Sequence, residues 1–318
     1  MKISYNKNGD NMKRFLSFCI FILLILLVIQ YKGEITEFVL LNFVYKNDFN
    51  YVNENEYKRE NDFSYFKSTD NYKPNNLTDT INIIYSSVNK GYDSFNFYCP
   101  ISYENCLDDV KYLTDNNEFL SNINNFVHPF NSYNKLNITV NSLGKISIDV
   151  DKLYSDNMIK ELNTEIDRVY NNLIRESMTD REKIRVIHDY IINRTKYDQK
   201  KADDITNNTS TSLYLSHTAY GPLFQGYGIC SGYTDAMTLF LNKMHIPNYK
   251  ISSATHVWNL VYIDGSWLNL DLTFDDPVYD NGYETVSDKY FLIDTRKLIS
   301  LDKANHDFDA NIFREAIN

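Results

Sequence analysis

The chain has 318 residues and a formal charge of −10, and 43% of its residues are hydrophobic and 15% aromatic. This composition is that of a folding protein and excludes a disordered chain. The length allows one large domain or two smaller ones. An acidic surface repels phosphate backbones, and no Lys/Arg cluster overcomes that repulsion locally, so we expect no nucleic acid among the partners.

An apolar segment near the N-terminus predicts a membrane helix. Lys13 and Arg14 precede an apolar run over residues 15–29 that has one polar exception. At about 1.5 Å per residue, residues 15–31 would span roughly 25 Å, near the short limit for crossing a bilayer. A cleaved signal peptide is the alternative, but no small-x-small cleavage motif follows. We therefore expect residues 1–32 to anchor the chain, with the remainder extracytoplasmic by the positive-inside rule; secretion after cleavage is the alternative.

The rest of the chain divides into three parts. Residues 33–77 are polar and have no sustained period, which predicts a linker or stalk. Residues 78–150 contain two helical patterns, a short strand and a hairpin signal around 141–144, which predict a small α/β unit. Residues 151–318 contain the candidate chemistry and are predicted to form the catalytic domain.

The predicted catalytic domain begins with two amphipathic helices. Apolar residues at helical spacing predict the first over 159–173. A capping box formed by Thr179 and Glu182 starts the second, whose apolar stripe includes His188. We interpret His188 as a buried core histidine. A polar loop is expected over 199–212.

Cys230 lies in a sequence that suits a nucleophile. It follows Gly226 and Gly228, which permit a sharp turn, and it precedes a helix-compatible apolar run over 236–241. A thiol at a helix N-terminus feels the positive end of the macrodipole, which favours the thiolate, and the amide there can stabilise an oxyanion. A lone cysteine is, however, more often simply a small buried residue.

His256 and Asp271 are predicted to be neighbours across a hairpin. His256 starts an alternating segment, and Asp271 follows 15 residues later, beyond the turn signal Asp264-Gly265. Counting outward from that turn leaves the two residues offset by about two positions. An acid beside an imidazole fixes its tautomer and orientation, as a Cys–His couple requires. A core histidine and an edge-strand surface acid are the alternatives.

Three ordered sequence blocks resemble the transglutaminase-like superfamily. They are Gly228-Ile-Cys-Ser-Gly-Tyr233, His256-Val-Trp-Asn259 and Asp271-Leu-Thr-Phe-Asp-Asp-Pro277, preceded by Tyr220-Gly-Pro-Leu223. The resemblance covers roughly residues 155–306. Thr234, Val257 and Phe274 depart from the family pattern, at positions that we interpret as packing positions.

The resemblance implies an α+β, papain-like core, in which a helix bearing Cys230 packs on an antiparallel sheet bearing His256 and Asp271. This core would follow the small α/β unit and the membrane helix. The resemblance further implies that Cys230 is the nucleophile, His256 the base and Asp271 the orienting acid. The implied activity is acyl transfer from amide bonds of proteins or peptides, with hydrolysis slightly favoured over amine cross-linking. The alternative is an inactive binding or scaffold module of the cell envelope.

Four further residues are secondary candidates for this site. Gln225 and Tyr220 are candidate oxyanion donors, although a surface glutamine is the more frequent role of such a residue. Trp258 and Tyr233 are candidates for the substrate pocket, although Trp258 at this position is also expected to pack beneath the site.

The remaining cysteines and histidines predict little further chemistry. Cys99 and Cys106 can form a disulfide if the body is extracytoplasmic. No CxxC pair or other metal-ligand spacing occurs, so we predict no metal and no cofactor. The acidic pair 275–276 is interpreted as part of a turn. The sequence identifies no partner for His217 or His306.

Overall fold

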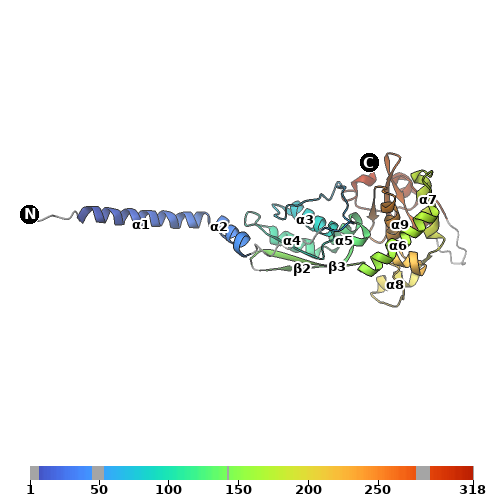
Figure 1. The fold of residues 1–318 in the computed structure, drawn as a ribbon, viewed down its shortest axis with the longest axis horizontal. Coiled ribbons are helices and arrows are strands. Elements are labelled where there is room, and N and C mark those ends of the chain that lie inside the picture. Colours follow the sequence, from blue (N-terminus) through green and yellow to red (C-terminus); the bar gives the residue numbers. More distant parts are fainter. Residues whose placement is uncertain (1–6, 45–53, 142, 277–286, 318) are drawn as a thin grey trace, which may run out of the picture.

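The computed structural model describes residues 7–44, 54–141, 143–276 and 287–317. Helices α1 (Lys7–Gln30) and α2 (Lys32–Val39) and the short π-helix η1 (Leu40–Val44) extend from a mixed α/β body (Figure 1). The segment Met12–Gln30 is long and apolar enough to cross a membrane, and none of it is buried within the described chain. A signal sequence would have the same properties.

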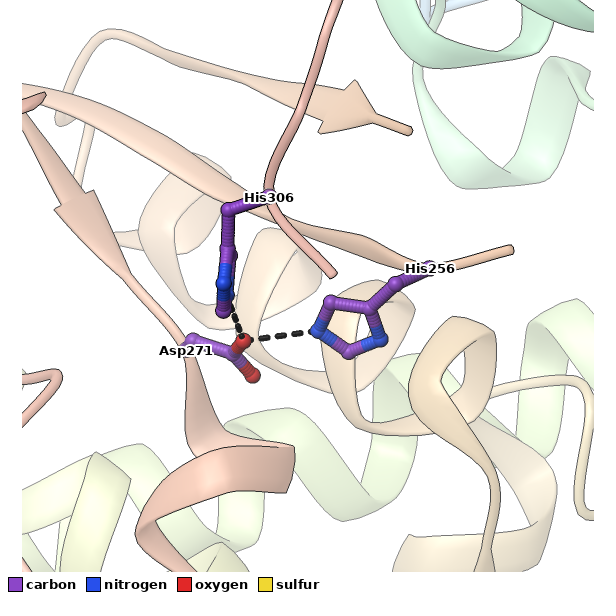
Figure 2. A group of neighbouring side chains, drawn as sticks. All are labelled: His256, Asp271 and His306. Atoms are coloured by element: carbon purple, nitrogen blue, oxygen red, sulfur yellow. Dashed lines mark hydrogen bonds and ion pairs between the residues drawn. The ribbon is translucent and has the colours of Figure 1, made fainter. Parts of the chain in front are cut away.

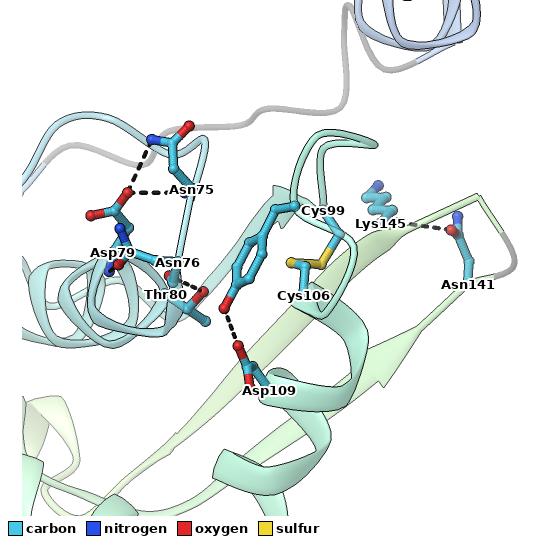
Figure 3. The surroundings of a disulfide bond; sticks show 10 residues. Asn75, Asn76, Asp79, Thr80, Cys99, Cys106, Asp109, Asn141 and Lys145 are labelled. Carbon is cyan, nitrogen blue, oxygen red and sulfur yellow. Dashed lines mark hydrogen bonds between the residues drawn. A yellow bond between two sulfur atoms is a disulfide. The ribbon is translucent and has the colours of Figure 1, made fainter. Parts of the chain in front are cut away.

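The predicted small α/β unit is present as a three-stranded antiparallel sheet with helices packed beside it. Its strand order is β1-β3-β2. The predicted hairpin around residues 141–144 is confirmed, since Val140 pairs with Ile146. A disulfide joins Cys99, just after β1, to Cys106 at the start of α4 (Figure 3). The elements are α3 (Leu77–Asn89), β1 (Ser94–Tyr98), α4 (Cys106–Asp115), α5 (Asn117–Phe126), η2 (Pro129–Asn131), β2 (Tyr133–Val140) and β3 (Lys145–Lys152).

The C-terminal half has an α+β core, as predicted, in which helices cover one face of an antiparallel sheet of order β6-β7-β8. Strands β4 and β5 form a separate parallel pair. The elements are α6 (Asp156–Leu173), α7 (Asp180–Ile192), β4 (Lys196–Tyr197), α8 (Gln199–Asn207), η3 (Gly221–Gln225), β5 (Tyr227–Gly228), α9 (Cys230–Lys243), β6 (Asn248–Ser252), β7 (Val257–Ile263), β8 (Ser266–Leu270), α10 (Leu272–Asp275), α11 (Thr295–Leu301) and η4 (Arg314–Ile317).

Two local signals in the sequence are confirmed by this half of the chain. The capping box is present at the start of α7, where the side chains of Thr179 and Glu182 each accept the other's backbone amide. The hairpin between β7 and β8 turns at Asp264 and Gly265, whose φ angles are 54° and 78°. A two-residue turn of this kind requires positive φ at both positions, which an Asp-Gly pair tolerates.

The expected polar loop over 199–212 is wrong in its first half, which forms helix α8. The Asp198 carboxylate caps this helix by accepting a backbone amide of its first turn at 3.0 Å. The buried Asp204 carboxylate then accepts hydrogen bonds from three residues of the following loop. So polar a helix has no apolar stripe for the sequence pattern to reveal.

The expected linker over 33–77 is also wrong in part, because residues 54–76 belong to the folded body; residues 45–53 lie outside the described chain. Phe66 has no exposed surface. Its ring stacks on Tyr85 with centroids 4.9 Å apart and meets Phe126 edge-on at the same distance. Scattered aromatic residues without a period can therefore anchor an irregular segment that composition alone describes as a linker.

The sheet β6–β8 lies between two hydrophobic cores, because side chains alternate between its faces. One face, with Tyr249 and Trp258, packs against the small α/β unit and Phe66. The other face, with Val261 and Leu270, packs against α6, α7 and α9. The predicted boundary near residue 150 therefore separates two chain segments that both contribute to the first of these cores.

Truncating Phe66 tests whether residues 54–76 belong to the fold. Phe66→Ala should lower the free energy of unfolding by about 3–5 kcal/mol, because it leaves a cavity in an aromatic cluster. Tyr112→Ala on α4 is the control, since its side chain is 58% exposed; it should change stability by less than about 0.5 kcal/mol. Denaturant unfolding of the full chain in detergent measures both, and equal effects would contradict the assignment.

Candidate functional site

Cys230 is the first residue of α9 and follows a tight connection from η3. Gly226, with φ 74°, ends η3 in the left-handed region that favours glycine. The amide of Ile229 then donates to the carbonyl of Ser216 at 2.9 Å. A side chain at Gly232 would collide with that same carbonyl oxygen, so the glycine lets the helix start close to the preceding loop. These contacts set the position of the thiol.

Helix α9 is docked on β7 by side-chain hydrogen bonds. The Thr234 hydroxyl donates to the carbonyl of Val257 at 3.0 Å. The Asn259 amide donates to the Thr238 hydroxyl at 2.8 Å and to the Thr234 carbonyl at 3.2 Å. The departure from the family pattern at Thr234 thus adds a hydrogen bond to the residue that follows His256.

A buried polar network anchors the same helix to the neighbouring strand β6. The Lys250 ammonium on β6 lies 2.8 Å from the Asp235 carboxylate on α9. Tyr154 donates its hydroxyl to Asp235 at 2.7 Å and accepts the Ala219 amide at 2.8 Å. Leaving either charge of a buried pair without its partner is costly, so the pair favours one position of α9 against the sheet.

The structure brings His256 and Asp271 together. The pairing of Asn259 with Leu270 places Asp271 across from Trp258, two positions from His256, so the predicted offset is confirmed. His256 Nε2 lies 2.7 Å from Asp271 Oδ2 (Figure 2). The Cys230 side chain lies near enough to the ring to help hold its proton. The three predicted residues therefore lie together at one site, in which His256 and Asp271 are hydrogen-bonded.

The electrostatics of the site favour the charged forms of His256 and Asp271. Burial lowers the pKa of His256, but the Asp271 carboxylate and the Cys230 sulfur outweigh it and raise that pKa to about 10. Burial alone would raise the pKa of Asp271, yet His256 and His306 hold it well below its usual range.

These shifts make folding stability depend on pH. The histidine contribution is complete below about pH 6.5 and is lost as the pH rises from there through the folded-state value of about 10. The Asp271 contribution is present above the carboxyl's ordinary pKa and is lost as the pH falls through the lowered one. The pair therefore stabilises the fold most at mildly acidic to neutral pH.

His306 is a site residue that the sequence did not reveal. It is fully buried, and its Nε2 lies 3.0 Å from Asp271 Oδ2 (Figure 2). It is 35 residues beyond Asp271 along the chain, outside any of the three sequence blocks. No local spacing marks it, because only the path of the chain after α11 brings it back to the end of β8.

A second buried histidine–acid pair lies behind this site. His188 on α7 has no exposed surface, and its Nε2 lies 3.2 Å from Asp275 Oδ2, so the prediction of a partnered core histidine is confirmed. Asp275 is buried as well, and its other oxygen accepts the Tyr290 amide at 3.0 Å. The interpretation of Asp275 as an ordinary turn residue is therefore wrong. Burial raises the pKa of Asp275 despite the His188 hydrogen bond.

The two pocket candidates are buried beneath the site rather than exposed in a pocket. Trp258 has no exposed surface, stacks on His256 with ring centroids 5.6 Å apart, and donates to Asn269 at 2.9 Å. Tyr233 is 1% exposed and donates its hydroxyl to Asp276 at 2.6 Å. Neither residue presents its ring to a substrate, because both rings are buried. Their hydrogen bonds instead support the fold around the site.

The two oxyanion candidates have partners of their own. The Gln225 side-chain carbonyl accepts the Leu215 amide at 2.7 Å, just before the connection to Cys230. The Tyr220 hydroxyl donates to Glu161 on α6 at 2.9 Å. The backbone amide of Cys230, at the start of α9, is the better placed donor, since the first helical hydrogen bond comes from Tyr233.

Metal-binding potential is confined, among the residues that the structure describes, to the candidate site itself. Donor atoms of His256, Asp271 and His306 lie within 4.8 Å of one another. The two hydrogen bonds to Asp271 already account for this spacing. A separate cavity lined by Arg59, His128 and other residues does not include any of these three.

Comparison with known proteins finds a family model that matches the segment containing Cys230, His256 and Asp271. Residues 167–272 match the family model described as the transglutaminase-like superfamily. No curated protein matches the chain. Its fold is similar to that of a crystallised TGase, with 16% identity over 49% of this chain and 48% of the other and a TM-score of 0.34. It is also similar to a protein of Cytophaga hutchinsonii that was proposed to be a cysteine protease, with 13% identity over 48% and 65% of the two chains and a TM-score of 0.27.

The protonation of His256 can be measured without a substrate. Its ring should remain protonated through neutral pH and titrate near 10, and in Asp271→Asn its pKa should fall below the ordinary histidine value, because burial remains and the carboxylate is gone. Histidine ring signals followed by NMR over pH measure this. The control is His245→Gln, on the loop after α9, which should leave the titration unchanged. A His256 titration near the ordinary value in the native chain would contradict the assignment.

Proposed function

We propose that the protein is a cysteine-dependent enzyme acting on amide bonds of proteins or peptides, since residues 167–272 match the family model of the transglutaminase-like superfamily. The observation that carries this proposal is that Cys230, His256 and Asp271 meet at one site, with His256 hydrogen-bonded to the Asp271 carboxylate. These residues come from the start of α9, the start of β7 and the end of β8, so the site depends on the whole core.

The geometry supports nucleophilic attack by the Cys230 sulfur. Because Nε2–H stays bonded to Asp271, Nδ1 is the ring nitrogen that can take the proton of the nearby Cys230 thiol. The resulting imidazolium is stabilised by the buried carboxylate, and the thiolate lies at the positive end of α9. Attack on an amide carbonyl forms a C–S bond and an oxyanion, which the Cys230 amide can stabilise.

Collapse of that intermediate breaks the C–N bond. His256 donates its Nδ1 proton to the departing amine, which leaves an acyl group on Cys230. A water molecule or a second amine then gives a proton to His256, attacks the acyl carbon and releases the thiolate. The first half of this reaction is the same for hydrolysis and for cross-linking.

We favour hydrolysis slightly, because a site open to solvent loses its acyl group to water by default. Cys230 is partly exposed, which is consistent with such access. The alternative is a catalytically inactive module that binds partners of the cell envelope. Retention of all three residues favours the enzyme, since a binding module has no need of them.

A membrane-anchored enzyme outside the cytoplasm fits the N-terminal helix and the disulfide. The apolar segment Met12–Gln30 follows basic residues, and the disulfide between Cys99 and Cys106 is typical of an oxidising compartment. Envelope proteins or peptides would then be the available substrates. N-terminal sequencing of the mature protein distinguishes an intact anchor from a cleaved signal.

Reactivity of Cys230 tests the proposed function directly. Iodoacetamide should alkylate Cys230 at neutral pH faster than it alkylates a free thiol, and His256→Ala should lower the rate by about tenfold or more, because the couple that activates sulfur is lost. Cys230 in the chain unfolded by denaturant is the control, since it is then an ordinary thiol. A rate equal to that of a free thiol, and independent of His256, would rule out the enzyme.

A second experiment tests whether water or an amine accepts the acyl group from Cys230. Peptide release should exceed incorporation of a labelled primary amine into a protein substrate, because water reaches the acyl-enzyme freely, and both should disappear in Cys230→Ala. Mass spectrometry of a protein mixture incubated with the enzyme and the labelled amine measures both products. Dominant amine incorporation would refute the preference for hydrolysis.

A further inference from the structure

The proposed triad leaves one histidine of the site without a role. His306 lies on the loop after α11 and has no exposed surface. Its Nε2 lies 3.0 Å from Asp271 Oδ2, and its Nδ1 lies 2.8 Å from the backbone carbonyl of Asp302. Figure 2 shows His306 and His256 reaching the same carboxylate oxygen from different directions.

The hydrogen-bond partners of His306 determine how many protons its ring carries. A backbone carbonyl only accepts, so the Nδ1 that faces Asp302 must carry a proton. The Asp271 carboxyl is held ionised, so its Oδ2 also only accepts, and Nε2 must carry a second proton. Both ring nitrogens of His306 are therefore donors, which makes the ring an imidazolium.

The surroundings of the ring suit a cation. His306 stacks on Tyr290, with centroids 5.6 Å apart, and meets Trp258 and Phe274 at 4.8 and 4.9 Å. Aromatic faces attract a cation in a desolvated site. The titratable groups that face His306 from the elements packed around it are Asp271, His256, Tyr290 and Asp302, and Asp275 lies within electrostatic range of Asp271.

The second histidine completes the hydrogen bonding of Asp271. A carboxylate offers about four acceptor positions. Asp271 Oδ1 accepts the amides of Thr273 and Phe274 at 3.0 and 3.2 Å. Oδ2 accepts His256 and His306. With all positions filled, the carboxylate cannot rotate without breaking a buried hydrogen bond, so its orientation toward His256 is fixed.

We infer that His306 is a positioning residue of this site, an imidazolium that holds the Asp271 carboxylate toward His256 and balances its buried charge. This inference rests on the proposed function for its catalytic meaning. The site is then a group of four residues, in which His306 acts through Asp271 and does not touch the substrate. Its positive charge also limits how strongly Asp271 draws a proton onto His256.

Nitrogen NMR of the native chain tests the charge of His306 without any substitution. In histidine-labelled full-length protein in detergent micelles, both ring nitrogens of His306 should show the signals of a protonated imidazolium at neutral pH. A neutral ring with an unprotonated Nε2 would overturn the inference. So would an Nε2 signal that changes when a chelator removes a bound metal ion.

Two variants separate the hydrogen bond from the charge. His306→Gln can keep a donor toward Asp271 without the charge, whereas His306→Leu removes both at similar volume. The alkylation rate of Cys230 in the glutamine variant should stay within about threefold of the native rate, and in the leucine variant it should fall by about tenfold or more, as for misplaced catalytic groups. The pH at which the His256 ring loses its proton, followed by NMR, should rise in the glutamine variant, because a like charge near His256 is gone.

Equal rates in the two variants, or a His256 titration unchanged from the native one in the glutamine variant, would overturn the positioning role. The result also separates this inference from the proposed function. Cys230 reactivity that depends on His256 but not on His306 refutes only the inference. If the alkylation rate of Cys230 is unchanged in His256→Ala while NMR shows His306 to be an imidazolium, the proposed function fails. The role of His306 in holding Asp271 then remains.

Discussion

The candidate site depends on one buried charge, the carboxylate of Asp271. It is 1% exposed, so an unpartnered charge here would be costly, and the surrounding chain supplies donors to each of its oxygens. The first turn of α10 provides two amides, and two histidines from distant segments provide the others. The short helix, the hairpin and the loop after α11 are therefore held together at a single residue.

The second constraint is the position of α9 against the sheet. The position of Cys230 near His256 depends on the hydrogen bonds of the helix to β7 and on the buried pair of Asp235 and Lys250, which ties it to β6. The opposite face of the sheet is covered by the small α/β unit, which packs on Trp258 directly beneath the His256 ring. That unit therefore supports the imidazole even though it contributes no residue to the candidate triad.

The chemistry proposed for this site follows from that arrangement. Asp271 holds Nε2 of the imidazole and leaves Nδ1 free to exchange a proton with the nearby sulfur, so a proton can move between Cys230 and His256 while Asp271 keeps the ring in place. The partly exposed sulfur gives a substrate access from one side. His306 bonds to Asp271 on the buried side of the site, where it balances the charge of the carboxylate and does not contact the substrate.

Local signals in the sequence were sufficient for much of this structure. The Asp-Gly turn set the β7–β8 register, which brings Asp271 within reach of His256, and the glycines before Cys230 indicated a turn into a helix. Such features depend on residues close in the chain. Helix α8 and the packed segment 54–76 were missed, because their polar and irregular patterns acquire structure only from contacts with distant residues. His306, the burial of Trp258 and Tyr233, and the pairing of His188 with Asp275 were likewise decided by tertiary structure, since each depends on where separate segments meet. The sequence alone thus determined which residues could form the Cys–His–Asp chain, whereas only the packing of the fold decided what surrounds and charges it.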